Sequence, residues 1–137
     1  MRHWLIKFAP FRTSWTDIVR TGSFTLRGVR SSEACKHLAT MRTGDPVLYY
    51  HSQRERAVVW VLEVTGTSYP DPTSADSRWL TCDFRPVQRL SRPVSLAELR
   101  QEDRLVGLRL LRQPRLAVMP ITSLEFASII AIAARAS

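Results

Sequence analysis

Arginine is the residue type in this sequence with the clearest chemical capability. The chain has 20 basic and 12 acidic residues and a formal net charge of +8, and its only lysines are Lys7 and Lys36. A guanidinium group binds phosphate through two parallel hydrogen bonds and stacks on nucleobases. The composition therefore favours a polyanion partner, DNA or RNA, although arginine-rich codon usage in a GC-rich genome explains the same bias.

The positive charge is spread along the whole chain. Residues 1–68 carry 10 basic and 5 acidic side chains, and residues 69–137 carry 10 and 7. The sequence has no basic tail, so any nucleic-acid-binding surface has to be assembled by folding.

Residue patterns typical of catalysis are weak. Asp71 and Asp76 could form an acid–base pair, but aspartates in a proline-containing loop usually accept hydrogen bonds from local backbone amides. His51 and Ser52 are adjacent, and neighbours in a strand point to opposite faces, so adjacency does not make a Ser–His pair. No Walker loop, G-x-S-x-G or H-E-x-x-H motif occurs. We therefore expect a binding module that is not an enzyme and uses no cofactor.

The cysteines and histidines do not form a metal-binding pattern. Cys35 and Cys82 lie 47 positions apart, and neither belongs to a C-x-x-C motif. His3, His37 and His51 are not clustered at ligand spacing. We expect both cysteines to be small buried side chains.

Length and hydropathy bound the class of protein. A chain of 137 residues with 45% hydrophobic residues predicts a single domain over residues 1–137. Apolar runs such as residues 129–134 are too short to cross a bilayer. Lys7 interrupts the N-terminal apolar stretch before a signal peptide develops. We expect a cytoplasmic protein without a membrane partner, and the sequence leaves its oligomeric state open.

Capping motifs and apolar periodicity divide the chain into helices and strands. Helices are expected to begin at Ser14, Ser31, Ser95 and Thr122. Strand-like patterns cover residues 3–8, 47–51, 57–67, 78–90 and 116–119, with a hairpin between the second and third. Residues 68–77 have the composition of a loop, and residues 105–113 that of a turn or short helix.

From Trp79 to Arg85, apolar residues alternate with residues that are mostly polar. This alternation indicates a strand with one buried face and one solvent-exposed face. The mixture of elements predicts an α+β fold. We expect a small, mostly antiparallel sheet, curled or closed into a barrel, with the C-terminal helix packed on it.

Seven short segments form an ordered pattern along nearly the whole chain. They are Trp4–Lys7 (with Pro10 after it), Gly28–Arg30, Met41–Asp45, Leu48–Ser52, Tyr69–Thr73, Arg92–Leu96 and Leu110–Leu116. Together these segments resemble the motifs of the EVE-domain family, within the PUA-like superfamily. The resemblance implies a PUA-like curled antiparallel sheet or pseudo-barrel with flanking helices.

The resemblance also implies a pocket beside the first strand that reads a nucleotide. The expected ligand is a modified base, such as methylated cytosine in DNA, or a modified RNA. The resemblance implies that seven residues surround the bound nucleotide: Lys7, Phe8, Leu26, Gly28, Val29, Arg30 and Ala117. From their types and spacing we add Trp60, Arg112 and Arg115.

Several positions depart from the family pattern. The family has Trp-Asp before the glycine, where this chain has Leu26 and Arg27, and Phe8 and Ala117 replace serines. A leucine offers no stacking face, so Phe8 or Trp60 would have to supply it. Base discrimination is then expected to depend on shape and apolar contact.

The residues leave some alternatives open. Arg30 can bind phosphate beside a helix N-terminus or pair with Glu33, and Lys7 can contact a ligand or extend to water. Trp60 can fill the core or form a stacking wall. The alternative to a base reader is a PUA-like module with a degenerate pocket that acts as a structural or protein-partner-binding domain. A hydrolase or nucleotide-modifying enzyme ranks third.

Overall fold

The computed structural model describes residues 1–8, 14–53 and 55–135. Its helices are α1 (Trp15–Thr21), α2 (Ser32–Thr40), α3 (Leu96–Gln101), the 3₁₀ turn η1 (Asp103–Leu105), α4 (Arg109–Arg112) and α5 (Ser123–Ala134). Its strands are β1 (His3–Phe8), β2 (Phe24–Thr25), β3 (Pro46–His51), β4 (Ala57–Val64), β5 (Tyr69–Pro70), β6 (Leu80–Thr81), β7 (Asp83–Ser95) and β8 (Val118–Ile121).

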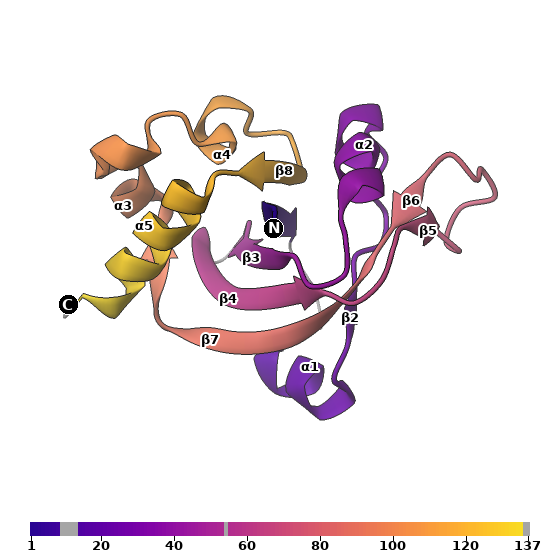
Figure 1. Ribbon diagram of the computed structural model, residues 1–137, viewed down its shortest axis with the longest axis horizontal. Coiled ribbons are helices and arrows are strands. Elements are labelled where there is room, and N and C mark those ends of the chain that lie inside the picture. Colours follow the sequence, from indigo (N-terminus) through magenta and orange to yellow (C-terminus); the bar gives the residue numbers. More distant parts are fainter. Residues whose placement is uncertain (9–13, 54, 136–137) are drawn as a thin grey trace.

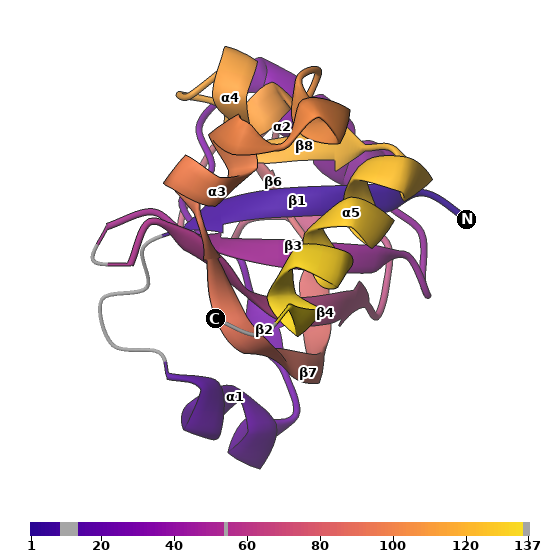
Figure 2. The ribbon, with the colours of Figure 1, turned by 90° about the vertical axis from the view of Figure 1, so that its left-hand side faces the viewer.

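One curled sheet organises the molecule. Its strand order is β2-β7-β4-β3-β1-β8, and all neighbours are antiparallel except β1 and β3. Figure 1 shows β4 and β7 bending around the centre, with α3, α4 and α5 at one side and α2 with the β5–β6 ribbon at the other. The view in Figure 2 shows α5 lying across the sheet. This α+β half-barrel confirms the expected fold class.

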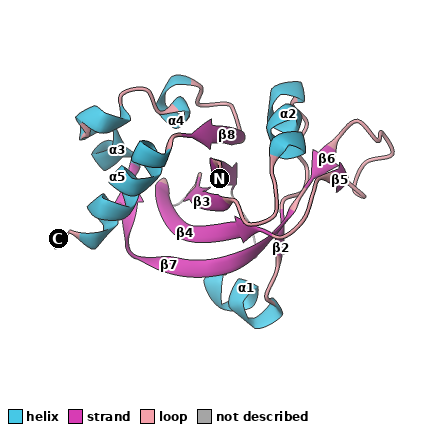
Figure 3. Cartoon of the chain, viewed as in Figure 1, coloured by secondary structure: helices cyan, strands magenta, loops and turns pink. Residues whose placement is uncertain are grey.

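The helices begin where the capping residues predict. Ser14, Ser95 and Thr122 each accept a hydrogen bond from the backbone N–H three residues on, and Asp17, Glu98 and Glu125 return the bond as full capping boxes. Ser31 caps α2 through the Ala34 N–H. Figure 3 shows these helices arranged around the curled sheet.

Strand limits are where sequence interpretation was least accurate. We expected a strand to end at Leu90, but β7 continues through Pro93 to Ser95. Register shifts on β4 between Val58 and Trp60 and between Val61 and Leu62 are irregularities of the kind that accommodates prolines beside the ladder. The expected loop over residues 68–77 begins with β5, which pairs with β6.

The core is continuous from the first strand to the last helix. Trp4 is 1% exposed, and its indole N–H donates to Asp45 Oδ2 at 3.0 Å, which gives the buried ring a polar partner. Cys35 and Cys82 are both buried, as expected. Burial raises the pKa of the Cys82 thiol to about 12, so this cysteine is a packing residue and not a thiolate.

Candidate nucleic-acid interface

The loop from Gly28 to Arg30 is held by a single buried carboxylate. The Gly28 N–H donates to Asp71 Oδ2 at 2.9 Å, and Arg30 Nη1 donates to the same oxygen at 3.1 Å. Gly28 has a φ of 84°, a conformation that favours glycine over other residues. The loop that the family resemblance places at the nucleotide is thus anchored to Asp71, 41 positions beyond Arg30.

Asp71 is fully used as a hydrogen-bond acceptor. Its Oδ1 accepts from the Thr73 backbone N–H at 2.8 Å and from the Thr73 hydroxyl at 2.7 Å. Burial pushes the pKa of this carboxyl upward, but the bonds from Gly28, Thr73 and Arg30 outweigh it and leave the pKa well below its usual range. Asp71 therefore positions Arg30. Of the two roles considered for this aspartate, acceptor of local hydrogen bonds and member of an acid–base pair, the structure favours the first.

Arg30 pairs with Asp71 and not with Glu33. Its second amino group donates to Thr73 Oγ1 at 3.2 Å, while 37% of its side chain remains exposed. Glu33 instead lies 3.7 Å from Arg109 and 3.7 Å from His37. The anchoring fixes the direction of the Arg30 guanidinium and leaves part of it open to solvent, which suits contact with a phosphate.

The segment after α4 faces the start of α2. Lys7 Nζ donates to the Pro114 carbonyl, and the Lys7 backbone N–H donates to the Ala117 carbonyl at 2.8 Å. Arg112 is exposed and donates through Nε to the Val106 carbonyl at 3.2 Å. Between the two segments lies a cavity of about 420 Å³, which we call the α2 cavity. It is lined by Ser31, Glu33, Gln113, Pro114, Arg115 and Leu116.

The apolar residues expected at the nucleotide do not line the α2 cavity. Leu26 is fully buried and Val29 is 6% exposed, so both support the Gly28 loop from the core side. Phe8 and Ala117 are half-buried, and the Phe8 ring meets the Phe24 ring edge-on with centroids 5.9 Å apart. Of the residues expected around the nucleotide, the structure thus brings Arg115 alone to the lining of the α2 cavity.

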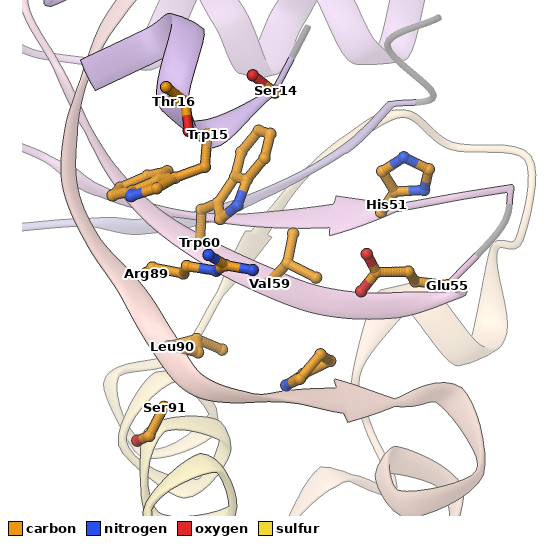
Figure 4. A pocket seen from close by; sticks show the side chains of 11 residues that line it. Ser14, Trp15, Thr16, His51, Glu55, Val59, Trp60, Arg89, Leu90 and Ser91 are labelled. Atoms are coloured by element: carbon orange, nitrogen blue, oxygen red, sulfur yellow. The ribbon is translucent and has the colours of Figure 1, made fainter. Parts of the chain in front are cut away.

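Trp60 lies at a second and larger cavity. Its indole packs on Tyr49, with centroids 4.4 Å apart, and on Trp15, with centroids 5.6 Å apart. Trp60 is 7% exposed and still lines a cavity of about 570 Å³, which we call the tryptophan cavity (Figure 4). Trp60 therefore fills the core, and the cavity that it lines is not the one at Arg115. Its lining residues are Ser14, Trp15, Thr16, His51, Glu55, Val59, Trp60, Arg89, Leu90, Ser91 and Pro93.

Trp15 and Arg89, which also line this cavity, were not predicted as site residues from the sequence. Trp15 follows the Ser14 cap and could have been marked as an aromatic residue at a helix start. Arg89 is the register partner of Trp60 across β4 and β7, a pairing that depends on two register shifts and has no local signal.

Within the described ranges, no group of three or more His, Cys, Asp or Glu side chains could hold a metal ion. No helix in the described part of the chain has the length and apolarity needed to cross a membrane.

Comparison with known proteins decides the family. The model of the EVE domain matches residues 2–132. This chain belongs to the EVE domain family. It is 25% identical over 90% of its length to thymocyte nuclear protein 1 of Gallus gallus, of which it spans 65%, and also 25% identical to the Homo sapiens protein, of which it spans 70%.

Solved structures of EVE-like chains agree with the fold. Protein Atu2648 from Agrobacterium tumefaciens is 31% identical with a TM-score of 0.92, covering 98% of this chain and 94% of that one. Human THYN1, solved in complex with DNA containing 5-methylcytosine, is 22% identical with a TM-score of 0.90, covering all of both chains. At that identity the likeness to human THYN1 establishes the shared fold.

Proposed function

We propose that this EVE domain binds nucleic acid and receives a base, such as 5-methylcytosine in DNA or a modified base in RNA, at the α2 cavity. The observation that carries the proposal is a concave edge lined by Arg115 in a domain of charge +8. Two further lining residues connect it to other cations, because Ser31 follows Arg30 in the chain and the Pro114 carbonyl accepts from Lys7. The human relative's complex with methylated DNA supports the same partner class.

The exposed arginines of this edge would contact phosphates. Arg30 is pre-positioned by Asp71, and Arg112 and Arg115 are exposed on the opposite segment. Such contacts release counterions and hold the strand without reading sequence. Lys7 lies beside them with its ammonium on the Pro114 carbonyl.

The cavity wall carries one group suited to a cytosine edge. Glu33 lies on the lining, and a carboxylate accepts a hydrogen bond from the exocyclic amino group of cytosine. Leu116 lies on the same lining and offers apolar contact to a methyl group. The proposed role is binding by shape, charge and one polar contact, without a catalytic step.

Fluorescence anisotropy with matched oligonucleotides tests the proposal. Single- and double-stranded DNA and RNA, each with cytosine or 5-methylcytosine, are titrated against wild type, Arg115→Ala and the control Arg104→Ala. Arg104 is exposed in η1, and its guanidinium pairs with Glu102, away from the cavity. We expect Arg115→Ala to weaken binding by about fivefold or more, with Arg104→Ala close to wild type.

A degenerate-pocket module is the second candidate. The full burial of Leu26 and the edge-on packing of Phe8 against Phe24 favour it, because Leu26 stands where the family has a tryptophan and Phe8 where it has a serine. No binding of any oligonucleotide at low salt would replace the reader proposal with a partner-binding or structural role.

A further inference from the structure

The tryptophan cavity shares no lining residue with the α2 cavity. It lies between the start of α1 and the strands β4 and β7, and Figure 4 shows the two indoles at one end with His51 and Glu55 at the other. Its volume of about 570 Å³ is in the range of small-molecule sites.

The aromatic wall of the cavity is rigidly supported. Trp60 rests on the fully buried Tyr49 ring at 4.4 Å between centroids, and Tyr49 in turn meets Phe24 at 5.5 Å. Trp15 extends the wall at a 40° tilt and is only half-buried. A supported indole with an accessible neighbour is a platform on which any nucleobase can stack.

A cation lies directly beside this wall. Arg89 is the cross-strand partner of Trp60, which places both side chains on the same face of the β4–β7 pair. Arg89 is exposed, and among the described residues no carboxylate lies within 4 Å of its guanidinium. Arg85, on the same strand, is by contrast paired with Glu63. Arg89 is thus available to an anion.

The opposite rim of the cavity is polar, with His51 and Glu55 on its lining. The buried Nδ1 of His51 has no hydrogen-bond partner among the described residues. The exposed Glu55 carboxylate adds an acceptor on the same side.

We propose that the tryptophan cavity is a second nucleotide site. The base stacks on Trp15 and Trp60, the phosphate binds Arg89, and His51 and Glu55 contact the edge of the base. Arg89 beside the indoles favours this ligand over an organic cation, which would otherwise suit two tryptophans and a glutamate. The nucleotide is either a free mononucleotide or an unstacked nucleotide of a strand held at the α2 cavity, and the second source depends on the proposed function.

The test uses calorimetry with nucleoside monophosphates and the corresponding nucleosides, and anisotropy with oligonucleotides. Trp15→Ala is expected to weaken binding at this site by about fivefold or more. Arg89→Ala is expected to weaken binding of the phosphate-bearing ligand by a similar factor, while the nucleoside binds as to wild type. Arg85→Ala is the matched control and leaves both unchanged.

Three results support the proposal and identify the source. Monophosphate binding that is unchanged in Arg115→Ala supports a free-nucleotide site. This conclusion would hold even if the α2 cavity bound nothing. Loss of oligonucleotide affinity in Trp15→Ala and Arg89→Ala, without monophosphate binding, supports a strand nucleotide. Oligonucleotide affinity that falls for Arg115→Ala and for Arg89→Ala supports occupation of both cavities by one strand.

Two results would overturn it. The first is no monophosphate binding together with unchanged oligonucleotide affinity in Trp15→Ala and Arg89→Ala. The second is an equal loss in Arg85→Ala, which would show a general charge effect. Circular dichroism and urea midpoints confirm that each variant is folded, and Arg89→Ala, at an exposed position, keeps the test decisive if Trp15→Ala is unstable.

Discussion

The Gly28–Arg30 loop and the tryptophan cavity are positioned by different forces. The loop is fixed by hydrogen bonds to one buried carboxylate, Asp71, which accepts from Gly28, Arg30 and Thr73. The tryptophan cavity is formed by ring packing, in which Tyr49 supports Trp60 and Trp60 supports Trp15. Hydrogen bonds to Asp71 orient a single side chain, and their strength depends on pH. Aromatic packing forms a surface, and its stability depends on the volume of the side chains. Substitutions in each region, together with an acid titration, separate these two modes.

The largest expected effect is on the aromatic side. Trp60→Ala removes a nearly buried indole that two other rings contact, and it should lower the free energy of unfolding by about 3–5 kcal/mol. Trp60→Phe keeps much of the volume and should cost clearly less. Urea unfolding measures both, and a loss below about 1 kcal/mol for the alanine variant would mean that Trp60 is not part of the supported wall.

Removal of the polar anchor should have the next largest effect. Asp71→Ala takes the acceptor from two backbone N–H groups and from the Arg30 guanidinium, which we expect to cost about 2–3 kcal/mol in the free energy of unfolding. Thr73→Ala removes one donor to Asp71 and one acceptor for Arg30, and it serves as the graded control. If the two variants have the same urea midpoint, the loop is not held by Asp71.

Acid should weaken the polar region before the aromatic one. The folded-state pKa values of Asp71 and Glu98 are both lowered, that of Glu98 to about 2 mainly through its hydrogen bond with Arg92. Stability from a lowered carboxyl pKa is present above the unfolded pKa of about 4 and is lost as pH falls through the folded pKa. We expect the urea midpoint to fall from pH 5 to pH 3, and the slope to be smaller in Asp71→Asn.

Arg30→Ala should have the smallest effect on stability. The side chain is more than a third exposed, so we expect a loss within about 1 kcal/mol. Affinity for oligonucleotides should fall by a similar factor for every sequence, because a phosphate contact carries no base information. Anisotropy with methylated and unmodified DNA checks this, and a change in the ratio of the two affinities would assign Arg30 to base recognition.

Much of the fold could be predicted from local signals. Three capping boxes mark α1, α3 and α5, because the side chains that begin a helix are neighbours in the chain. The length of β7 could not be predicted, since its continuation to Ser95 depends on pairing with β4 across register shifts. Prolines that locally argue against a strand are tolerated there for the same reason.

Part of the candidate site could likewise be predicted from the sequence, and part could not. Because Arg30 and Arg115 are arginines, phosphate contact could be predicted for them from the sequence. The segments that carry them were recognised because they match the family motifs in order along the chain. The partner of Arg30 could not be predicted, because Asp71 lies 41 positions away and Glu33 is the nearer carboxylate in sequence. The Trp60–Arg89 pair likewise exists only through tertiary pairing of two strands.

The salt dependence of DNA affinity is the most direct test of a phosphate-binding edge at the α2 cavity. Anisotropy titrations from 50 to 200 mM salt, run for wild type, Arg115→Ala and Arg104→Ala, give the slope of log affinity against log salt. We predict a steep negative slope for wild type that becomes shallower by about 0.7–0.9 in Arg115→Ala and is unchanged in Arg104→Ala. Equal slopes for all three proteins would contradict the proposed interface.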